Sequence, residues 1–96
     1  MSYYSMKDWK FIGFRKSNTK LKKYDSLIKN KQTGKIKIIP FGSSSYSQYK
    51  DSTGLGLYSH LDHNDKERRR RYKTRHQVYI KKGYYSAGYF SMRFLW

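Results

Sequence analysis

Short runs of apolar and aromatic residues, separated by turn residues, predict three strands in the first half of the chain. The run WKFIGFRK, 9–16, is aromatic and β-branched, and the turn-like SNTK follows it. The runs KYDSLIKN, 23–30, and KIKIIPFG, 35–42, flank KQTGK, where Gly34 can supply the positive φ of a tight loop. We expect a β-hairpin here. Pro40 should lie at the end of its second strand or on a sheet edge, because proline cannot donate a ladder hydrogen bond.

The middle of the chain, 42–59, reads GSSSYSQYKDSTGLGLYS and combines many small residues with three tyrosines. Serine and glycine favour turns whereas large rings favour burial, so the segment is expected to be an irregular but ordered loop. We expect one helical turn inside it, around 46–50. The DSTG at 51–54 predicts a turn, because an inserted Ser breaks the aspartic-protease motif and no second copy is present. The GLG at 54–56 is too short to indicate a nucleotide-binding fold.

A helix is predicted at 65–76, DKERRRRYKTRH. Asn64 can cap its first backbone N–H groups, and Glu67 three residues later completes a pattern like the capping box. Carboxylates stand in the first turn and cations in the last, as the helix dipole prefers. Tyr72 is the only aromatic residue, and no aliphatic residue is present, so the helix lacks the apolar stripe that docks a helix on a core. We expect weak tertiary packing.

The tail QVYIKKGYYSAGYFSMRFLW predicts two further strands, at 78–81 and 89–96, with a turn at Gly83 between them. Together the elements indicate an α+β fold, a small strand-rich domain with a β-hairpin and one basic helix. Ninety-six residues allow a single domain, 1–96, in which 1–8 is a candidate extended N-terminal arm.

The net charge of the chain indicates which kind of partner it binds. The chain has 22 Lys and Arg against 6 Asp and Glu, a net charge of +16 at pH 7, and a mean hydropathy of -1.03. Such values are typical of disordered chains, but aromatic residues make up 19% of the sequence and favour a folded, tyrosine-rich core. Net positive charge favours a polyanion or an acidic protein surface as the partner.

Several function classes are excluded or disfavoured by residues that the sequence lacks. Without cysteine there are no disulfides, thiolate zinc sites or cysteine nucleophiles. The N-terminal MSYYSMKDWK has no signal-peptide core, and no segment approaches the length of apolar chain that spans a bilayer. We therefore expect a soluble or surface-bound protein.

The cations of the predicted helix are the first candidate site. Arg69 with Lys73, and Arg71 with Arg75, are like charges four residues apart, and each such pair is unfavourable by about 0.2–0.5 kcal/mol. The planar fork of arginine suits bidentate contact with phosphate or carboxylate. The alternative is a solvated face whose arginine stems lie over nearby rings. The expected nucleic-acid or anion-binding residues are Arg68, Arg69, Arg70, Arg71, Lys73 and Arg75.

The histidines are candidate metal ligands. His60 and His63 have HxxH spacing, and Asp62, Asp65 and the distant His76 could add ligands for a divalent transition metal. Hydrogen-bonded loop histidines fit the same spacing, and no cysteine is present to complete a common zinc set. We favour this second interpretation, with no metal and no cofactor. A metal-dependent nuclease would also need a water activator and a place for the scissile phosphate, which the sequence does not identify.

The motifs are generic one by one, but their order along the chain is similar to that in a known protein family. A hairpin ending in IPFG is followed by YxxYKDxTGxGxYxHxDHxDxxRRRxYxxRH and then by SAGYFSxxxLW. This succession, over 24–96, resembles a family of small basic proteins of large double-stranded DNA viruses of algae and amoebae. The matching residues are Phe41, Gly42, Tyr46, Tyr49, Asp51, Thr53, Gly54, Gly56, His60, Asp62, His63, Asp65, Arg68, Arg69, Tyr72, Arg75 and His76.

The resemblance implies a viral protein that is carried in the particle, and it implies no particular activity. With the charge pattern, it leads us to expect a non-enzymatic structural component of a large DNA virus particle, a minor capsid or internal virion protein. Its partners would be acidic surfaces of other virion proteins or double-stranded DNA, and its location the virion or, during assembly, the host cytoplasm or viral factory. The alternative is a sequence-independent DNA-binding protein that condenses the genome.

Overall fold

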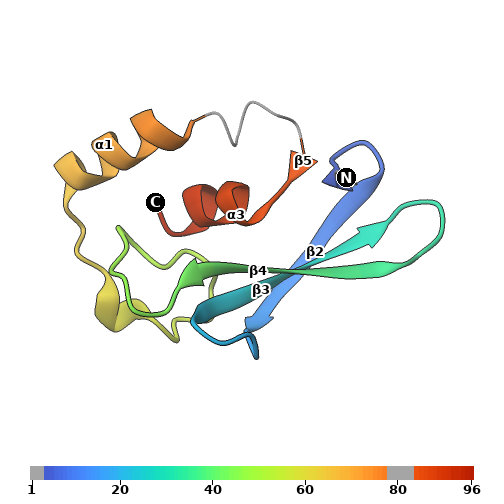
Figure 1. Ribbon diagram of the computed structural model, residues 1–96, viewed down its shortest axis with the longest axis horizontal. Helices are drawn as coiled ribbons and strands as arrows, with labels where there is room; N and C mark the ends of the chain where they lie inside the picture. The colour runs from blue at the N-terminus through green and yellow to red at the C-terminus, as the bar shows by residue number, and fades with distance from the viewer. Residues whose placement is uncertain (1–3, 78–83) are drawn as a thin grey trace.

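The computed structural model describes residues 4–77 and 84–96 of the chain (Figure 1). The described elements, in chain order, are β1 (Tyr4–Ser5), β2 (Trp9–Lys16), β3 (Lys22–Asn30), β4 (Ile36–Ser43), the 3-10 turn η1 (Ser59–Leu61), α1 (Lys66–His76), β5 (Tyr84–Tyr85) and α3 (Ala87–Phe94). They confirm the α+β class. The strand predicted at 78–81 and the turn at Gly83 lie outside the described residues.

The strands β2, β3 and β4 form one antiparallel sheet in that order. The predicted hairpin is confirmed as β3 and β4, with Gly34 at φ 76° in its loop. The side chain of Asn30 fixes the loop by accepting hydrogen bonds from two backbone N–H groups, those of Gln32 and Thr33. Pro40 pairs with Asp25 within β4, an edge strand of this sheet, as the missing N–H requires.

A second, two-stranded ladder joins the N-terminal region to the segment before α3. Tyr4 of β1 is opposite Tyr85 of β5, and Ser5 is opposite Tyr84. Residues from the start and the end of the chain therefore meet beside the main sheet (Figure 1).

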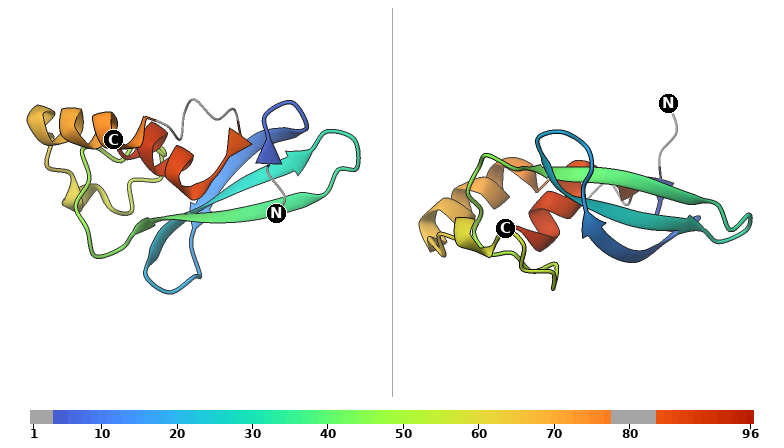
Figure 2. Two further views of the ribbon diagram at one scale, coloured as in Figure 1. Left: turned by 45° about the horizontal axis from the view of Figure 1, so that its top comes forward. Right: turned by 90° about the horizontal axis from the view of Figure 1, so that it is seen from below.

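The core lies between the three-stranded sheet and α3, which packs on one face of that sheet (Figure 2). Phe11 of β2 meets both Phe90 and Phe94 of α3, with ring centroids 5.5 and 5.9 Å apart, and Phe41 of β4 lies 5.7 Å from Phe90. The buried cluster consists of Tyr24, Ile28, Ile39, Phe41, Phe90 and Leu95. Rings thus supply most of the core volume, as the composition indicated.

The strand predicted at 89–96 is wrong, because this segment forms α3. Ser86 caps the helix by accepting a hydrogen bond from Tyr89 N at 3.1 Å. Phe90 and Phe94, four residues apart, lie on one helical face and both reach the sheet. Aromatic residues favour strands, but here the two rings are spaced so that a helix brings both of them onto the sheet. The described fold has two α-helices instead of one.

Among the described residues, no helix combines the length and the apolar content that crossing a membrane would need.

Candidate anion-binding surface

The helix α1 begins one residue later than predicted, and its cap is Asp65. The Asp65 carboxylate accepts hydrogen bonds from Glu67 N at 3.0 Å and Arg68 N at 3.2 Å, and these bonds hold its pKa below the usual value. The predicted cap, Asn64, is wrong. Asn64 has φ 54°, in the left-handed region, so it lies one residue outside the position that can cap the helix.

Aromatic side chains dock α1, and none of its residues is fully buried. Tyr72 stacks on Trp96, which follows α3, with centroids 4.2 Å apart and planes within 6°. Arg69 lies over the ring of Tyr49 at 4.8 Å, and its Nε donates to the backbone oxygen of Trp96 at 2.9 Å. The prediction of weak tertiary packing for this helix is confirmed, and Tyr72, its only aromatic residue, anchors it on Trp96.

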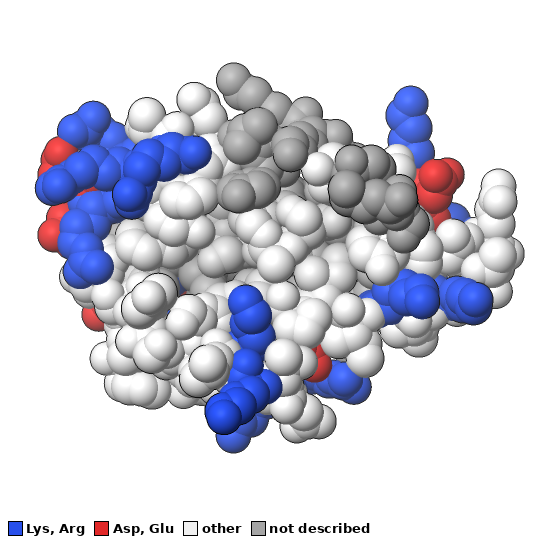
Figure 3. Space-filling model, in the orientation of Figure 1, with Lys and Arg blue, Asp and Glu red and all other residues white. Residues whose placement is uncertain are grey.

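Only two of the seven cations in α1 form an ion pair within the described residues. Glu67 accepts from Arg70 at 2.5 Å and lies 3.6 Å from Arg71. Asp65, the other carboxylate at the start of α1, uses its side chain as the helix cap. Lys and Arg side chains gather over α1, with a smaller number of Asp and Glu atoms at their edge (Figure 3). The remaining cations are Lys66, Arg68, Arg69, Lys73 and Arg75.

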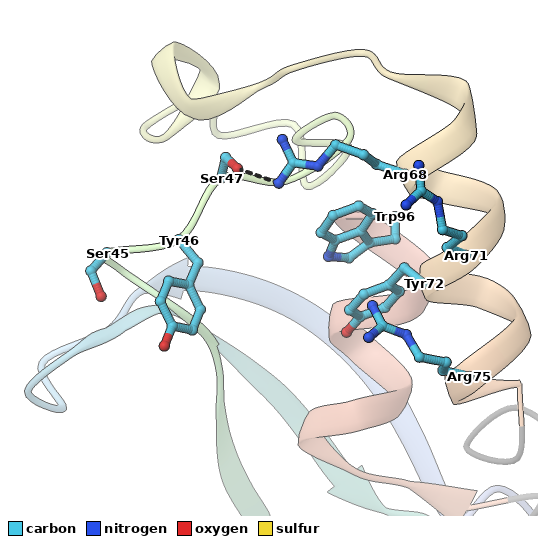
Figure 4. A pocket seen from close by; sticks show the side chains of 8 residues that line it. All are labelled: Ser45, Tyr46, Ser47, Arg68, Arg71, Tyr72, Arg75 and Trp96. Atoms are coloured by element: carbon cyan, nitrogen blue, oxygen red, sulfur yellow. Dashed lines mark hydrogen bonds between the residues drawn. The ribbon is translucent and has the colours of Figure 1, made fainter.

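Five of the six predicted site residues divide between two clefts beside α1, with Arg68, Arg71 and Arg75 in the first and Arg69 and Lys73 in the second. The first cleft has a volume of about 530 Å³ and lies between α1 and the loop after β4 (Figure 4). Across it, the Arg68 guanidinium donates to Ser47 Oγ at 3.2 Å. Its lining residues are Ser45, Tyr46, Ser47, Arg68, Arg71, Tyr72, Arg75 and Trp96.

The second cleft, of about 500 Å³, collects cations from three parts of the chain. Arg69 and Lys73 come from α1, Arg93 comes from α3, and Lys50 comes from the loop after β4. Burial, and then repulsion from Arg69 and Arg93, lowers the pKa of Lys73. Such a concentration of positive charge is stabilised by a bound anion. Arg70 lines neither of these clefts and faces Glu67.

Tertiary structure adds Tyr46, Lys50, Arg93 and Trp96 to the surface, and reasoning from sequence missed all four as site residues. Each lies more than ten residues from α1 along the chain. No local pattern could have placed them beside it.

A buried lysine holds the loop that forms one wall of the first cleft. Lys23 is 2% exposed, and its Nζ donates to Tyr46 O at 2.7 Å and to Gln48 Oε1. Burial lowers the pKa of Lys23, although Asp51 and Asp62 act in the opposite direction. Gln48 in turn donates to Asp62 Oδ1 at 2.7 Å. The helical turn predicted at 46–50 is wrong, because Gln48 pairs with the segment around Asp62 instead.

The DSTG segment is a structural turn. Asp51 accepts from Thr53 Oγ1 at 2.6 Å and from Thr53 N at 3.1 Å, and it also accepts from the Tyr24 hydroxyl. Burial alone raises the pKa of Asp51, but the hydrogen bonds from Thr53 and Tyr24 outweigh it and hold this pKa below its usual value. Asp51 therefore serves to tie the loop to β3.

Two of the three histidines are held in separate hydrogen bonds. His63 Nδ1 accepts from Asp65 N at 2.9 Å, and burial followed by the charge of Arg68 lowers the pKa of His63. His76 Nδ1 lies 2.9 Å from Tyr72 O, and His60 lies against the ring of Tyr58. Within the described residues no three metal-ligating side chains gather at one point.

Comparison with protein-family models, curated proteins and solved structures found no match for this chain. The resemblance to the viral family stays a prediction.

Proposed function

We propose that this chain is a non-enzymatic structural protein of a large DNA virus particle that attaches to nucleic acid through the cations of α1. One observation carries the proposal: Arg68, Arg69, Lys73 and Arg75 form no ion pair with the described carboxylates, yet they converge on two clefts. Cations held together in this way repel each other, and a bound polyanion relieves that repulsion.

Phosphate is the anion that the surface suits best. Arginine supplies most of the charge on α1, and its guanidinium can bind two phosphate oxygens at once. Contacts of this kind go to the backbone of the nucleic acid and are independent of base sequence. The resemblance to viral proteins supports a place inside the particle, where packaged DNA is the most abundant polyanion.

No catalytic step is part of the proposal. The acidic and imidazole groups nearest to α1 already serve the fold: Asp65 caps the helix, Asp51 closes a turn, and His63 accepts a backbone hydrogen bond.

The test compares two variants that each remove three positive charges. The first replaces Arg68, Arg71 and Arg75 by Gln, and the control replaces the exposed Lys20, Lys35 and Lys37 by Gln. Both variants have a net charge of +13, which is 16 minus 3. Affinity for a labelled DNA duplex is measured by fluorescence anisotropy over a range of salt concentrations.

The helix variant is expected to flatten the slope of log affinity against log salt by about 2.7, at 0.9 for each lost phosphate contact, whereas the control keeps the slope. Scrambling the DNA sequence should leave both affinities unchanged. An equal loss in the two variants would show that net charge alone drives binding. Absence of DNA binding, together with tight binding to polyglutamate, would favour an acidic protein surface.

A further inference from the structure

Tyr46 presents an open aromatic ring to the first cleft. Tyr46 is 72% exposed, and its ring and hydroxyl have no stacking or hydrogen-bond partner among the described residues. Its backbone, in contrast, is fixed. Tyr46 O accepts from the buried Lys23 Nζ at 2.7 Å, and Tyr46 N donates to Ser43 O at 3.3 Å. A ring carried on a fixed backbone binds a flat ligand with little loss of conformational entropy.

The other two rings of this cleft are already engaged. Tyr72 and Trp96 stack on each other, Tyr72 also lies 4.1 Å from His76, and Trp96 lies 5.1 Å from His63. Tyr46 stands on the loop across the cleft from them (Figure 4). It is therefore the ring of this cleft that can accept a new stacking partner.

A row of arginines stands opposite this ring. Arg68, Arg71 and Arg75 are spaced i, i+3 and i+7, so they share one face of α1, and all three line the cleft. At 1.5 Å per residue the row is about 10.5 Å long. The cleft thus offers a flat apolar surface on one wall and a line of phosphate-binding groups on the other.

We propose that the first cleft binds single-stranded nucleic acid, with one unpaired base stacked on Tyr46 and the flanking phosphates on Arg68, Arg71 and Arg75. This inference rests on the proposed function and narrows its partner. A duplex keeps its base faces stacked inside the helix, whereas an unpaired base can turn its face to an aromatic side chain. A ring and a cationic groove together are the usual means by which proteins hold single strands without reading their sequence.

The experiment compares two labelled probes of equal length, an oligothymidylate and an abasic oligonucleotide that keeps the phosphates but has no bases. The variants are Tyr46→Ala, Tyr46→Phe and the control Leu55→Ala, which removes an exposed apolar side chain outside the cleft. Melting temperatures confirm that each variant is folded. Kd is measured by fluorescence anisotropy at constant salt.

The wild type should bind oligothymidylate about 5- to 150-fold more tightly than the abasic probe, which corresponds to one stacked base. Tyr46→Ala should remove that difference, while Tyr46→Phe and Leu55→Ala keep it. Equal wild-type affinity for the two probes, or an unchanged preference in Tyr46→Ala, would overturn the inference. If the variant with Arg68, Arg71 and Arg75 replaced by Gln still lost affinity for both probes, the proposed function would stand and only the stacking inference would fall. If neither probe bound, both proposals would fall together.

Discussion

Tyr24→Phe tests how the loop after β4 is attached to the sheet, because it removes one oxygen from a fully buried residue. The Tyr24 hydroxyl donates to the Asp51 carboxylate and accepts from Leu57 N at 3.0 Å. The ring itself packs against Tyr58 and Phe41, with centroids 5.3 and 6.1 Å away, and phenylalanine preserves that packing. The variant therefore isolates the hydrogen bonds that hold the loop.

The expected loss of stability at neutral pH is about 2 kcal/mol. A hydrogen bond to a charged group contributes about 1.5–3 kcal/mol, and Leu57 is an exposed residue, so water can replace the hydroxyl as the partner of its N–H group. Asp51 retains both of its bonds from Thr53, so the turn should survive the substitution.

The same bond predicts a dependence on pH. Burial, and then the hydrogen bond to Asp51, raises the pKa of Tyr24 from 10.0 to about 12. Because the folded protein holds this proton more tightly than the unfolded chain, the stabilisation is complete below about pH 10 and is lost as pH rises to about 12. A shift of that size corresponds to about 2–3 kcal/mol. The stability difference between wild type and Tyr24→Phe should therefore shrink towards zero across this window.

Urea denaturation followed by tryptophan fluorescence measures both effects. Lysine titrations are common to wild type and variant, so they cancel in the difference. Tyr46→Phe, at an exposed tyrosine, is the control and should change stability by less than about 0.5 kcal/mol. A Tyr24→Phe variant as stable as wild type at neutral pH, or a difference that persists unchanged to about pH 12, would refute the reasoning.

Three further outcomes are expected. Gly42→Ala should destabilise the fold by about 2–4 kcal/mol in urea denaturation, because Gly42 has φ 76° and a Cβ there would lie 2.9 Å from Leu95 Cδ1. Tyr72→Ala should lower stability by about 1–2 kcal/mol, since its ring stacks on Trp96 but is not fully buried, and a loss below about 0.5 kcal/mol would contradict its anchoring role. Log affinity for duplex DNA should fall with log salt at a slope of about -4.5 to -6.3, from roughly five to seven phosphate contacts, and a flat response would count against phosphate binding.

A chelator gives an independent check on the histidines. It should leave the melting temperature unchanged, because the hydrogen bonds of His63 and His76 go to backbone groups. Stoichiometric zinc that is lost together with His60 and His63 would contradict this expectation.

Local chemistry made part of the structure predictable. The hairpin follows from two β-prone runs around Gly34, and the basic helix follows from helix-forming residues between polar caps. These features depend on residues that are neighbours in sequence, and they were predicted within a few residues. The weak packing of that helix followed equally, since Tyr72 is its only aromatic residue and it has no aliphatic residue.

The excess charge, the ring-rich core, the hairpin and the basic helix therefore follow from the amino-acid sequence alone. The other features depend on long-range packing. Helix α3 was misassigned because aromatic residues favour strands in isolation, and only packing of Phe90 and Phe94 against the sheet selects the helical spacing. The clefts likewise depend on distant partners: buried Lys23 sets the loop that presents Tyr46, and Arg93 joins the cations of α1 through the fold. Burial and long-range hydrogen bonds act between residues that are far apart along the chain, so no local pattern could show them.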